Sequence, residues 1–168
     1  MIKAILLAAG KSKRIGNENK LVKKFRNKFL INHSLLALYK SKVDQIVIVL
    51  GYQHNKVKKV IKKNKKNIFV LNKKFTLGIS SSINTGLKKI TKNDEGFIVV
   101  QSDMPFIKTS DINKIYNSIA KKSHLVHALK FKNKIGNPIG FDSLVLAKFK
   151  RMRGDVGAKF MVKRLKKN

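Results

Sequence analysis

The order of hydrophobic and polar positions divides the chain into alternating strands and helices. Continuous apolar runs that end at a glycine or a polar residue are typical of buried strands. They cover residues 2–8, 45–50, 67–71 and 96–101; a further strand is expected at 125–131 and a short one at 138–141. Apolar positions at helical spacing, some preceded by serine or asparagine caps, predict helices. These helices cover 32–41, 55–63, 80–90, 110–121, 143–150 and 157–165.

This alternation indicates the fold class. Regular repetition of apolar strands and helices predicts an α/β fold, a three-layer sandwich with a mostly parallel, Rossmann-like sheet. No internal repeat, linker or break in composition divides the chain, so residues 1–168 are expected to form one domain. Ligands of such sheets bind at the carboxyl ends of the strands. Gly10, Gly51 and Asp103 stand at three of these ends.

Length and composition exclude several classes of protein. The 168 residues are 43% hydrophobic, which is enough for a buried core and too much for a disordered tail. Cysteine is absent, so disulfides and cysteine-ligated metal sites are excluded. The apolar run at residues 4–9 is too short for a signal-peptide core or a membrane span, and no other segment is longer. The expected location is therefore the cytoplasm, with no membrane partner.

The net charge of +31, from 39 basic and 8 acidic residues, suggests an anionic partner such as nucleic acid, a membrane surface or a phosphorylated substrate. A compositional bias is the favoured explanation, because 34 of the basic residues are lysine and only 5 are arginine, alongside 15 asparagines and 18 isoleucines. Nucleic-acid readers prefer arginine and interleave aromatic rings, and the dense lysine stretch at 56–66 has no aromatic residue. A nucleic-acid partner is therefore not expected.

Candidate chemistry begins where the first strand ends. Residues 7–16 read LAAGKSKRIG, and Asn19 and Lys20 follow. Small residues let backbone N–H groups approach phosphate oxygens, and Arg14 and Lys20 supply the positive charge that phosphoryl or nucleotidyl transfer needs. The spacing matches neither a Walker loop nor a GxGxxG fingerprint. A glycine-terminated strand followed by a solvated basic loop is an equally open interpretation.

The scarcity of acids narrows the choice of metal ligands, since any Mg²⁺ site must draw its oxygen ligands mainly from eight carboxylates. Asp103 follows the most apolar strand of the chain, which favours a metal ligand over an ordinary turn residue.

The N-terminal loop, together with later segments in the same order, resembles the MobA-like nucleotidyltransferase family, and within it the molybdenum cofactor cytidylyltransferases. The resemblance covers residues 2–165 and implies the nucleotide-diphospho-sugar transferase type of fold. The later segments are VLGY at 49–52, GISSSI at 78–83, GL at 86–87, DMPF at 103–106, GNP at 136–138 and GDVGA at 154–158.

The resemblance implies a role for each of a set of residues. Arg14, Lys20 and Asp103 would be catalytic, with Arg14 on the outer phosphates, Lys20 near the α-phosphate and Asp103 on Mg²⁺. The implied nucleotide-binding set is Leu7, Ala8, Ala9, Gly10, Ser12, Arg14, Lys20, Gly51, Gly78, Ser80 and Ser82. Ala9 favours CTP over GTP, because guanylyl relatives carry glycine there.

The resemblance also implies the acceptor. The terminal phosphate of molybdopterin would attack the α-phosphorus of CTP and release pyrophosphate, and a molybdoenzyme that receives the cofactor is a further implied partner. Asn137 and Asp155 would bind the acceptor, and Asp155 would also contact the metal. The serines at 80–82 and Asp155 could instead be helix caps, and both interpretations stay open.

Family members usually continue past the GDVGA helix to a further strand and an acidic segment, whereas this chain ends at Asn168. Asp155 then takes the second metal contact, or the metal site is weaker, or activity is lost. Two other functions stay open. One is a guanylyl or other nucleotidyltransferase of the same superfamily, and the other is a non-catalytic basic protein that binds a nucleotide or RNA.

Overall fold

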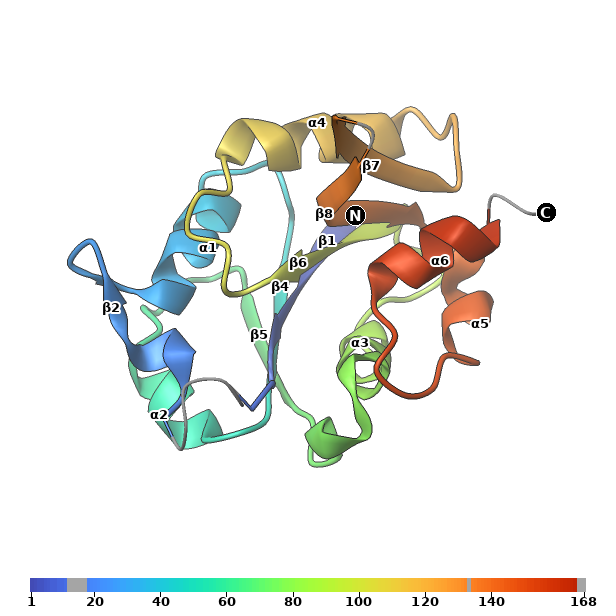
Figure 1. Cartoon of the computed structure of the whole chain (residues 1–168). Coiled ribbons are helices and arrows are strands. Elements are labelled where there is room, and N and C mark those ends of the chain that lie inside the picture. The colour runs from blue at the N-terminus through green and yellow to red at the C-terminus, as the bar shows by residue number, and fades with distance from the viewer. Residues whose placement is uncertain (12–17, 133, 166–168) are drawn as a thin grey trace.

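A six-stranded sheet forms the centre of the computed structural model, which describes residues 1–11, 18–132 and 134–165 (Figure 1). The strand order is β5-β4-β1-β6-β8-β7. Strands β5, β4, β1 and β6 are parallel to one another, and β8 runs antiparallel to both β6 and β7. The strands are β1 (Ile2–Ala8), β4 (Ile46–Leu50), β5 (Asn67–Leu71), β6 (Gly96–Gln101), β7 (Val126–Phe131) and β8 (Lys134–Asp142).

Helices cover both faces of this sheet (Figure 1). One face carries α1 (Leu30–Tyr39), α2 (His54–Lys59) and α4 (Thr109–Ala120), and the other carries α3 (Ile79–Leu87), α5 (Leu146–Phe149) and α6 (Ala158–Leu165). Short 3₁₀ turns lie at Lys20–Val22 (η2), Phe75–Leu77 (η3) and Ser143–Val145 (η4). The predicted three-layer α/β sandwich with a mostly parallel sheet is confirmed. The prediction that residues 1–168 form one domain stays a prediction.

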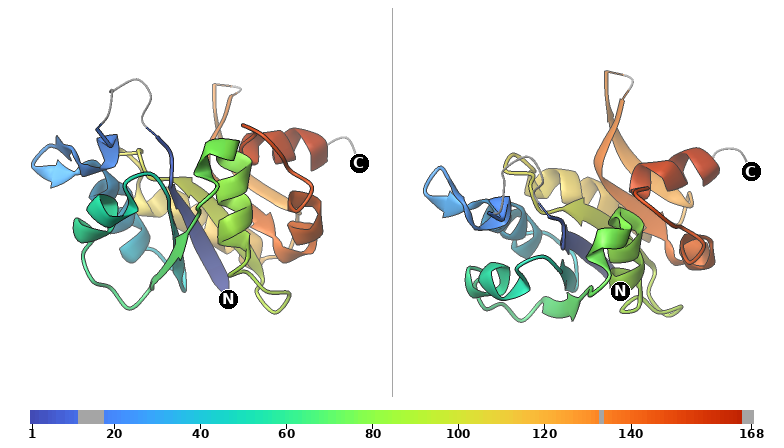
Figure 2. Two further views of the ribbon diagram at one scale, coloured as in Figure 1. Left: turned by 90° about the horizontal axis from the view of Figure 1, so that it is seen from below. Right: turned by 60° about the horizontal axis from the view of Figure 1, so that its bottom comes forward.

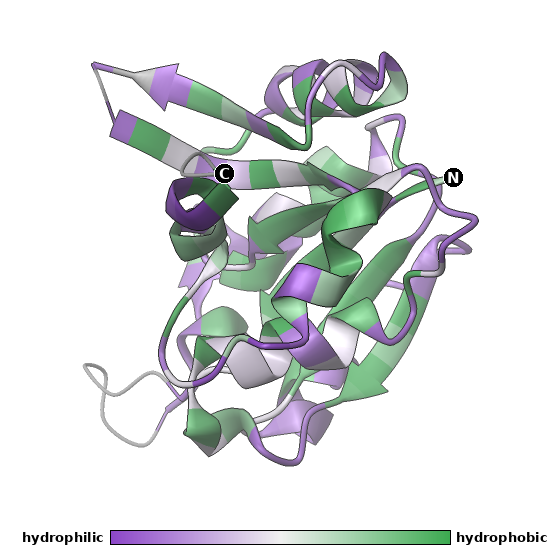
Figure 3. Cartoon of the chain, turned by 90° about the vertical axis from the view of Figure 1, so that its right-hand side faces the viewer, coloured by the Kyte–Doolittle hydropathy of each residue, from purple (hydrophilic) through white to green (hydrophobic). Residues whose placement is uncertain are grey.

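The central strands are mostly apolar because both of their faces are covered. All five residues of β4 are buried, and β1 pairs with β4 on one side and β6 on the other. Alternate residues of β1 face the two helical layers, Ala4 and Leu6 in one core and Ile5 in the other. Figure 3 shows the hydrophobic positions concentrated on the sheet strands.

Two elements differ from the expectation because local sequence does not signal them. Strand β8 spans Lys134–Asp142 rather than 138–141, since its first half pairs only with β7 and needs no continuous apolar run. Together β7 and β8 extend beyond the body of the molecule (Figure 2). A small hairpin of β2 (Lys24–Phe25) and β3 (Lys28–Phe29) was not predicted, because its turn residues Arg26 and Asn27 adopt positive φ without a glycine.

Close approach to the sheet fixes the position of α3. A Cβ atom added at Gly86 would lie 2.5 Å from a methyl carbon of Ile5 and 3.0 Å from one of Val49. No larger residue fits between the helix and β1 and β4, so α3 lies directly on the two central strands. None of the described helices is long and apolar enough to cross a membrane.

A buried ion pair lies at the amino end of the sheet. Lys3 Nζ is 3.0 Å from Asp94 Oδ2, and the two residues are 6% and 2% exposed. Lys3 also donates to the carbonyl of Lys89, while Asp94 accepts hydrogen bonds from the backbone and hydroxyl of Thr91. Burial raises the pKa of Asp94, but the hydrogen bonds from Thr91 and Lys3 outweigh it and hold this pKa below its ordinary value.

The lowered pKa makes the stability of the fold depend on pH. The contribution of ionised Asp94 is fully present above the ordinary pKa of 3.8 and is lost as the pH falls through the lowered value. Asp94→Asn should lower the free energy of unfolding by about 3 kcal/mol near neutral pH, since Lys3 is left unpaired. Urea unfolding at about pH 6 and about pH 3 should show this difference shrinking in acid. Asp111→Asn is the control, and an equal, pH-independent loss in both variants would contradict this account.

Candidate active site

The carboxyl ends of β1, β4 and β6 meet at one edge of the sheet. The backbone N–H of Tyr52 donates to the carbonyl of Ala9 at 3.0 Å, which joins the exit of β4 to that of β1. The hydroxyl of Ser102 donates to the carbonyl of Leu7 at 2.6 Å, which joins the exit of β6 to β1. The segment from Leu7 to Gly10 therefore lies between two neighbouring strand ends, where α/β sheets bind their ligands.

Within this segment only Gly10 is exposed. Ala8 and Ala9 are 1% exposed, Leu7 is half-buried and Gly10 is exposed with open space around its Cα. A Cβ added at Gly51 would lie 2.7 Å from both the Cβ and the carbonyl oxygen of Ala9. Glycine at position 51 thus lets the exit of β4 lie against Ala9. Ser12 and Arg14, two predicted nucleotide-binding residues, lie outside the described residues.

Two predicted catalytic residues, 83 positions apart in the sequence, contact each other directly. Lys20 Nζ is 2.5 Å from Asp103 Oδ2. Their side chains are 37% and 33% exposed, so both charges border solvent at the strand ends. The pair offers a cation that can bind a phosphate oxygen and a carboxylate that can bind a divalent cation.

Lys20 is held in place by its buried neighbour Asn19, which has no exposed surface. The side-chain oxygen of Asn19 accepts from the N–H of Leu21 at 3.0 Å and so caps η2. Its amide nitrogen donates to the carbonyl of Tyr52 at 3.1 Å. One side chain thereby ties the turn that carries Lys20 to the exit of β4.

Asp103 is positioned from the other side by Ser34 of α1, which is completely buried. The Ser34 hydroxyl lies 3.4 Å from the carbonyl of Gln101 and 3.2 Å from that of Met104, on either side of the Asp103 turn. Sequence reasoning missed both Ser34 and the anchoring role of Asn19. The link that the Ser102 hydroxyl makes between β6 and β1 was not anticipated from the sequence either.

The GISSSI segment (78–83), which carries three of the predicted nucleotide-binding residues, lies against the GDVGA segment (154–158). Gly78 has φ +96°, and a Cβ there would lie 2.5 Å from the backbone of Gly154. The Ser80 hydroxyl donates to the carbonyl of Gly154 at 2.6 Å. Asp155 Oδ1 accepts from the N–H of Ile79 at 3.2 Å, so Asp155 caps α3 rather than its own helix. The two motifs therefore form one structural unit.

The serines of this segment are engaged inside the protein. Ser80 is 2% exposed, and Ser82, which is 5% exposed, accepts a hydrogen bond from the amide of Asn72 at 3.0 Å. The same amide donates to the Ser81 hydroxyl at 2.9 Å. These hydroxyls hold the start of α3 to the exit of β5. Direct contacts of Gly78, Ser80 and Ser82 with a nucleotide stay a prediction.

The predicted acceptor residue Asn137 lies beside the turn that carries Asp103. It lines a shallow pocket of about 250 Å³ together with Asp111 and residues 104–107. Phe106, which is 66% exposed, borders the same pocket, and its ring packs edge-on against that of Phe25 on the β2–β3 hairpin. The acceptor-binding roles of Asn137 and Asp155 stay predictions.

Asp103 is the carboxylate at the strand ends that could bind a divalent metal ion. The described residues contain no group of three or more His, Cys, Asp or Glu side chains that could hold a metal ion. Asp103 can supply one exposed carboxylate oxygen, which fits Mg²⁺ that keeps water and phosphate oxygens as its other ligands. The residues do not fit an all-protein metal cage.

Known protein sequences resemble this chain over most of its length, and residues 4–168 match the family described as the MobA-like NTP transferase domain. The chain is 30% identical over 145 residues to the bifunctional protein GlmU of Clostridioides difficile (strain 630), covering 85% of this chain and 30% of that protein. It is 33% identical over 154 residues to adenosylcobinamide-phosphate guanylyltransferase of Methanocaldococcus jannaschii, and the match covers 86% of this chain and 76% of that protein. The chain spans about a third of the length of its GlmU relatives.

Solved structures share the fold. Rv0371c from Mycobacterium tuberculosis H37Rv has a TM-score of 0.84 at 20% identity, over 96% of this chain and 82% of that one. A second Rv0371c structure is a complex with manganese, with a TM-score of 0.79 at 18% identity over the same shares. Molybdopterin-guanine dinucleotide biosynthesis protein A from Archaeoglobus fulgidus has a TM-score of 0.70 at 20% identity, over 97% and 80%. At these identities the likeness establishes the fold alone.

The contact between Gly78 and Gly154 predicts unequal effects of alanine at the two positions. Both glycines have positive φ, but a Cβ at Gly154 meets no atom within 4 Å. Gly154→Ala should lower the free energy of unfolding by about 1 kcal/mol, from backbone strain alone. Gly78→Ala should lower it by about 3 kcal/mol, because strain and collision with the Gly154 backbone add. Urea unfolding measures both losses, and equal losses would contradict the close contact.

Proposed function

The chain belongs to the MobA-like NTP transferase domain family, and from this premise we propose that it transfers a nucleoside monophosphate from a nucleoside triphosphate to a phosphorylated acceptor, with release of pyrophosphate. The observation that carries the proposal is the Lys20–Asp103 ion pair at the joined ends of β1 and β6. It sets a cation and a carboxylate at the edge of the sheet where Ser102 joins the exit of β6 to β1.

The reaction needs no nucleophile from the protein. An acceptor phosphate oxygen attacks the α-phosphorus in line, and the bond to the β-phosphate oxygen breaks as pyrophosphate leaves. The residues that surround the strand ends hold the two substrates in this alignment. Bound Mg²⁺, held by Asp103, would offset the negative charge of the phosphates.

Each charge of the Lys20–Asp103 pair has an oppositely charged partner in the proposed magnesium–nucleotide ligand. Without ligand, Lys20 and Asp103 neutralise each other at 2.5 Å. A magnesium–nucleotide complex brings a cation for Asp103 and phosphate oxygens for Lys20, so each charge exchanges one partner for another. Lys20 would then stabilise the charge that develops at the α-phosphate. Arg14 is proposed to bind the outer phosphates.

The proposed donor is CTP and the proposed acceptor is molybdopterin. By the family resemblance, alanine at position 9 favours CTP as the donor. The Ala9 methyl group lies so close to Gly51, at the exit of β4, that a Cβ at position 51 would collide with it. Asn137 is proposed to bind the acceptor, since it shares a pocket with the turn after Asp103. The molybdoenzyme partner and the cytoplasmic location stay predictions.

Guanylyl transfer is the second candidate. The observation that favours it is the 33% identity to adenosylcobinamide-phosphate guanylyltransferase, a relative of which the chain covers 76%. This candidate keeps the same reaction and the same Lys20–Asp103 pair and changes only the base and the acceptor.

Nucleotide titrations test the ion pair. At about 0.15 M salt, CTP with Mg²⁺ should bind the wild type more tightly than CTP with EDTA. Asp103→Asn should lose this metal-dependent part, and Lys20→Gln should lower the rate of pyrophosphate release from CTP and molybdopterin by about 100-fold. Lys24→Gln, an exposed lysine of β2, is the control for net charge. Equal effects of Lys20→Gln and Lys24→Gln would contradict the proposal.

Base choice is tested at Ala9. The ratio of CTP to GTP affinity should exceed one in the wild type and fall by about tenfold in Ala9→Gly, a change of roughly 1.4 kcal/mol. The measurement is titration of both nucleotides with Mg²⁺ on both proteins. A wild-type preference for GTP would replace cytidylyl by guanylyl transfer and leave the general reaction standing. Failure of every triphosphate to bind would overturn the reaction itself.

A further inference from the structure

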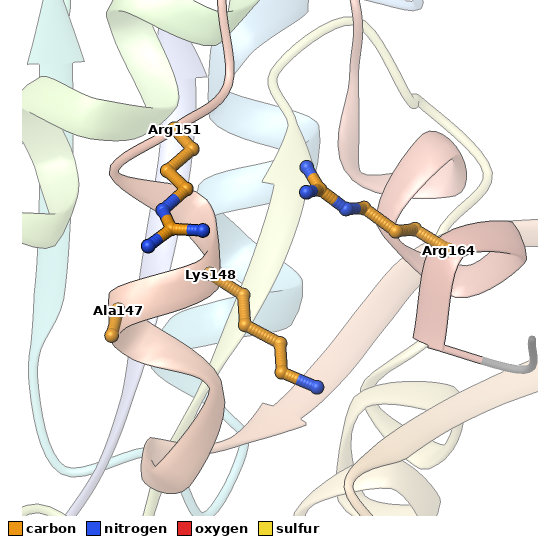
Figure 4. Close-up of a pocket in the computed structure, with 4 residues that line it drawn as sticks. All are labelled: Ala147, Lys148, Arg151 and Arg164. Carbon is orange, nitrogen blue, oxygen red and sulfur yellow. The ribbon is translucent and has the colours of Figure 1, made fainter. Parts of the chain in front are cut away.

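A second group of cations lies between α5 and α6, apart from the strand-end residues. Ala147, Lys148, Arg151 and Arg164 line a pocket of about 330 Å³. Figure 4 shows Lys148 and Arg151 extending from α5 and the residues that follow it, and Arg164 reaching toward them from the last turn of α6. Three positive charges, from α5, from the turn that follows it and from α6, thus surround one opening.

The net charge of the chain alone does not explain this group. Among the described arginines, Arg26 lies over the rings of Phe25 and Phe106, and Arg153 donates to two backbone carbonyls. The side chains of Arg151 and Arg164 make no hydrogen bond, ion pair or ring contact with any described residue. Both described arginines without such a contact line the same pocket, in a chain that has 34 lysines and only 5 arginines.

The lining of the pocket indicates the class of ligand. A guanidinium group can donate two parallel hydrogen bonds to the oxygens of one phosphate, and an ammonium group adds a compact positive charge. No acid is among the four lining residues, so a metal ion is not the ligand. No aromatic ring is among them either, so the pocket has no surface on which a base would stack. A small anion with two adjacent phosphate groups fits these features best.

We propose that the pocket between α5 and α6 is a second anion site, which binds a compact diphosphate-type small molecule through Lys148, Arg151 and Arg164. Binding there is independent of the reaction proposed at the strand ends. Inorganic pyrophosphate is the probe, because it carries two adjacent phosphates and no other recognisable group.

Methyl NMR of alanine distinguishes the two sites in one sample. The Ala147 methyl group lines the pocket, whereas Ala8 and Ala9 lie at the end of β1. Pyrophosphate should be titrated into the whole protein in EDTA at about 0.15 M salt. The Ala147 signal should shift along a saturating curve, with its own dissociation constant, whether or not the signals of Ala8 and Ala9 move.

A pair of matched double variants tests the named residues. Lys148→Gln with Arg164→Gln should weaken the Ala147 response at least about tenfold. Lys150→Gln with Lys163→Gln removes the same charge from the same two helical regions, from exposed residues that do not line the pocket, and should leave the response unchanged. Arg151 is kept, because it is three residues from Gly154, which contacts α3.

The outcomes separate the proposal from general attraction to a basic protein. A shift at Ala147 that never saturates, or that weakens equally in both double variants, would overturn it. A saturating shift confined to Ala8 and Ala9 would also overturn it, while agreeing with the strand-end site. Sulfate and a single-stranded oligonucleotide complete the series, and tighter binding of the oligonucleotide at Ala147 would replace the small-molecule ligand by nucleic acid.

Discussion

The pairing of β1 with β4 and β6 is the interaction on which the rest of the structure depends. All three strands run parallel, so their carboxyl ends reach the same edge of the sheet. The carbonyls of Leu7 and Ala9 then accept hydrogen bonds from Ser102 and Tyr52, which begin the loops after β6 and β4. Lys20 is tied to the loop after β4 through Asn19, and Asp103 belongs to the loop after β6.

Two fully buried polar residues, Asn19 and Ser34, position the charged side chains of the candidate site. Asn19 pairs with two backbone groups, and the single Ser34 hydroxyl proton is shared between two carbonyls that flank Asp103. Together these side chains fix the turns that carry Lys20 and Asp103. Hydrogen bonds in a dry interior hold geometry well, because a broken bond leaves a buried group unsatisfied. Two charges on opposite sides of the strand ends are therefore held in direct contact while both remain open to solvent.

The few acids of this lysine-rich chain show how its charge is organised. Seven of the eight make a specific contact with a backbone group or a cation. Two of them cap helical turns from outside, Asp142 at η4 and Asp155 at α3. The other five are Glu18, Asp44, Asp94, Glu95 and Asp103. Most of the lysines have no acid to pair with, so exposed positive charges occur over much of the protein. The pocket between α5 and α6 differs because three of these charges surround one opening.

The sequence by itself determined the fold class, the four parallel strands and the residues at their ends, because continuous apolar runs and glycines are local signals of buried strands and their exits. It also predicted Lys20 and Asp103 as partners in one site, through the resemblance of their motifs. Only the tertiary structure decided that these two side chains touch, that Asp155 caps α3, and that Arg151 and Arg164 face one pocket. Such contacts join residues far apart in the chain, and no local periodicity records which distant backbone group a buried serine or asparagine will meet.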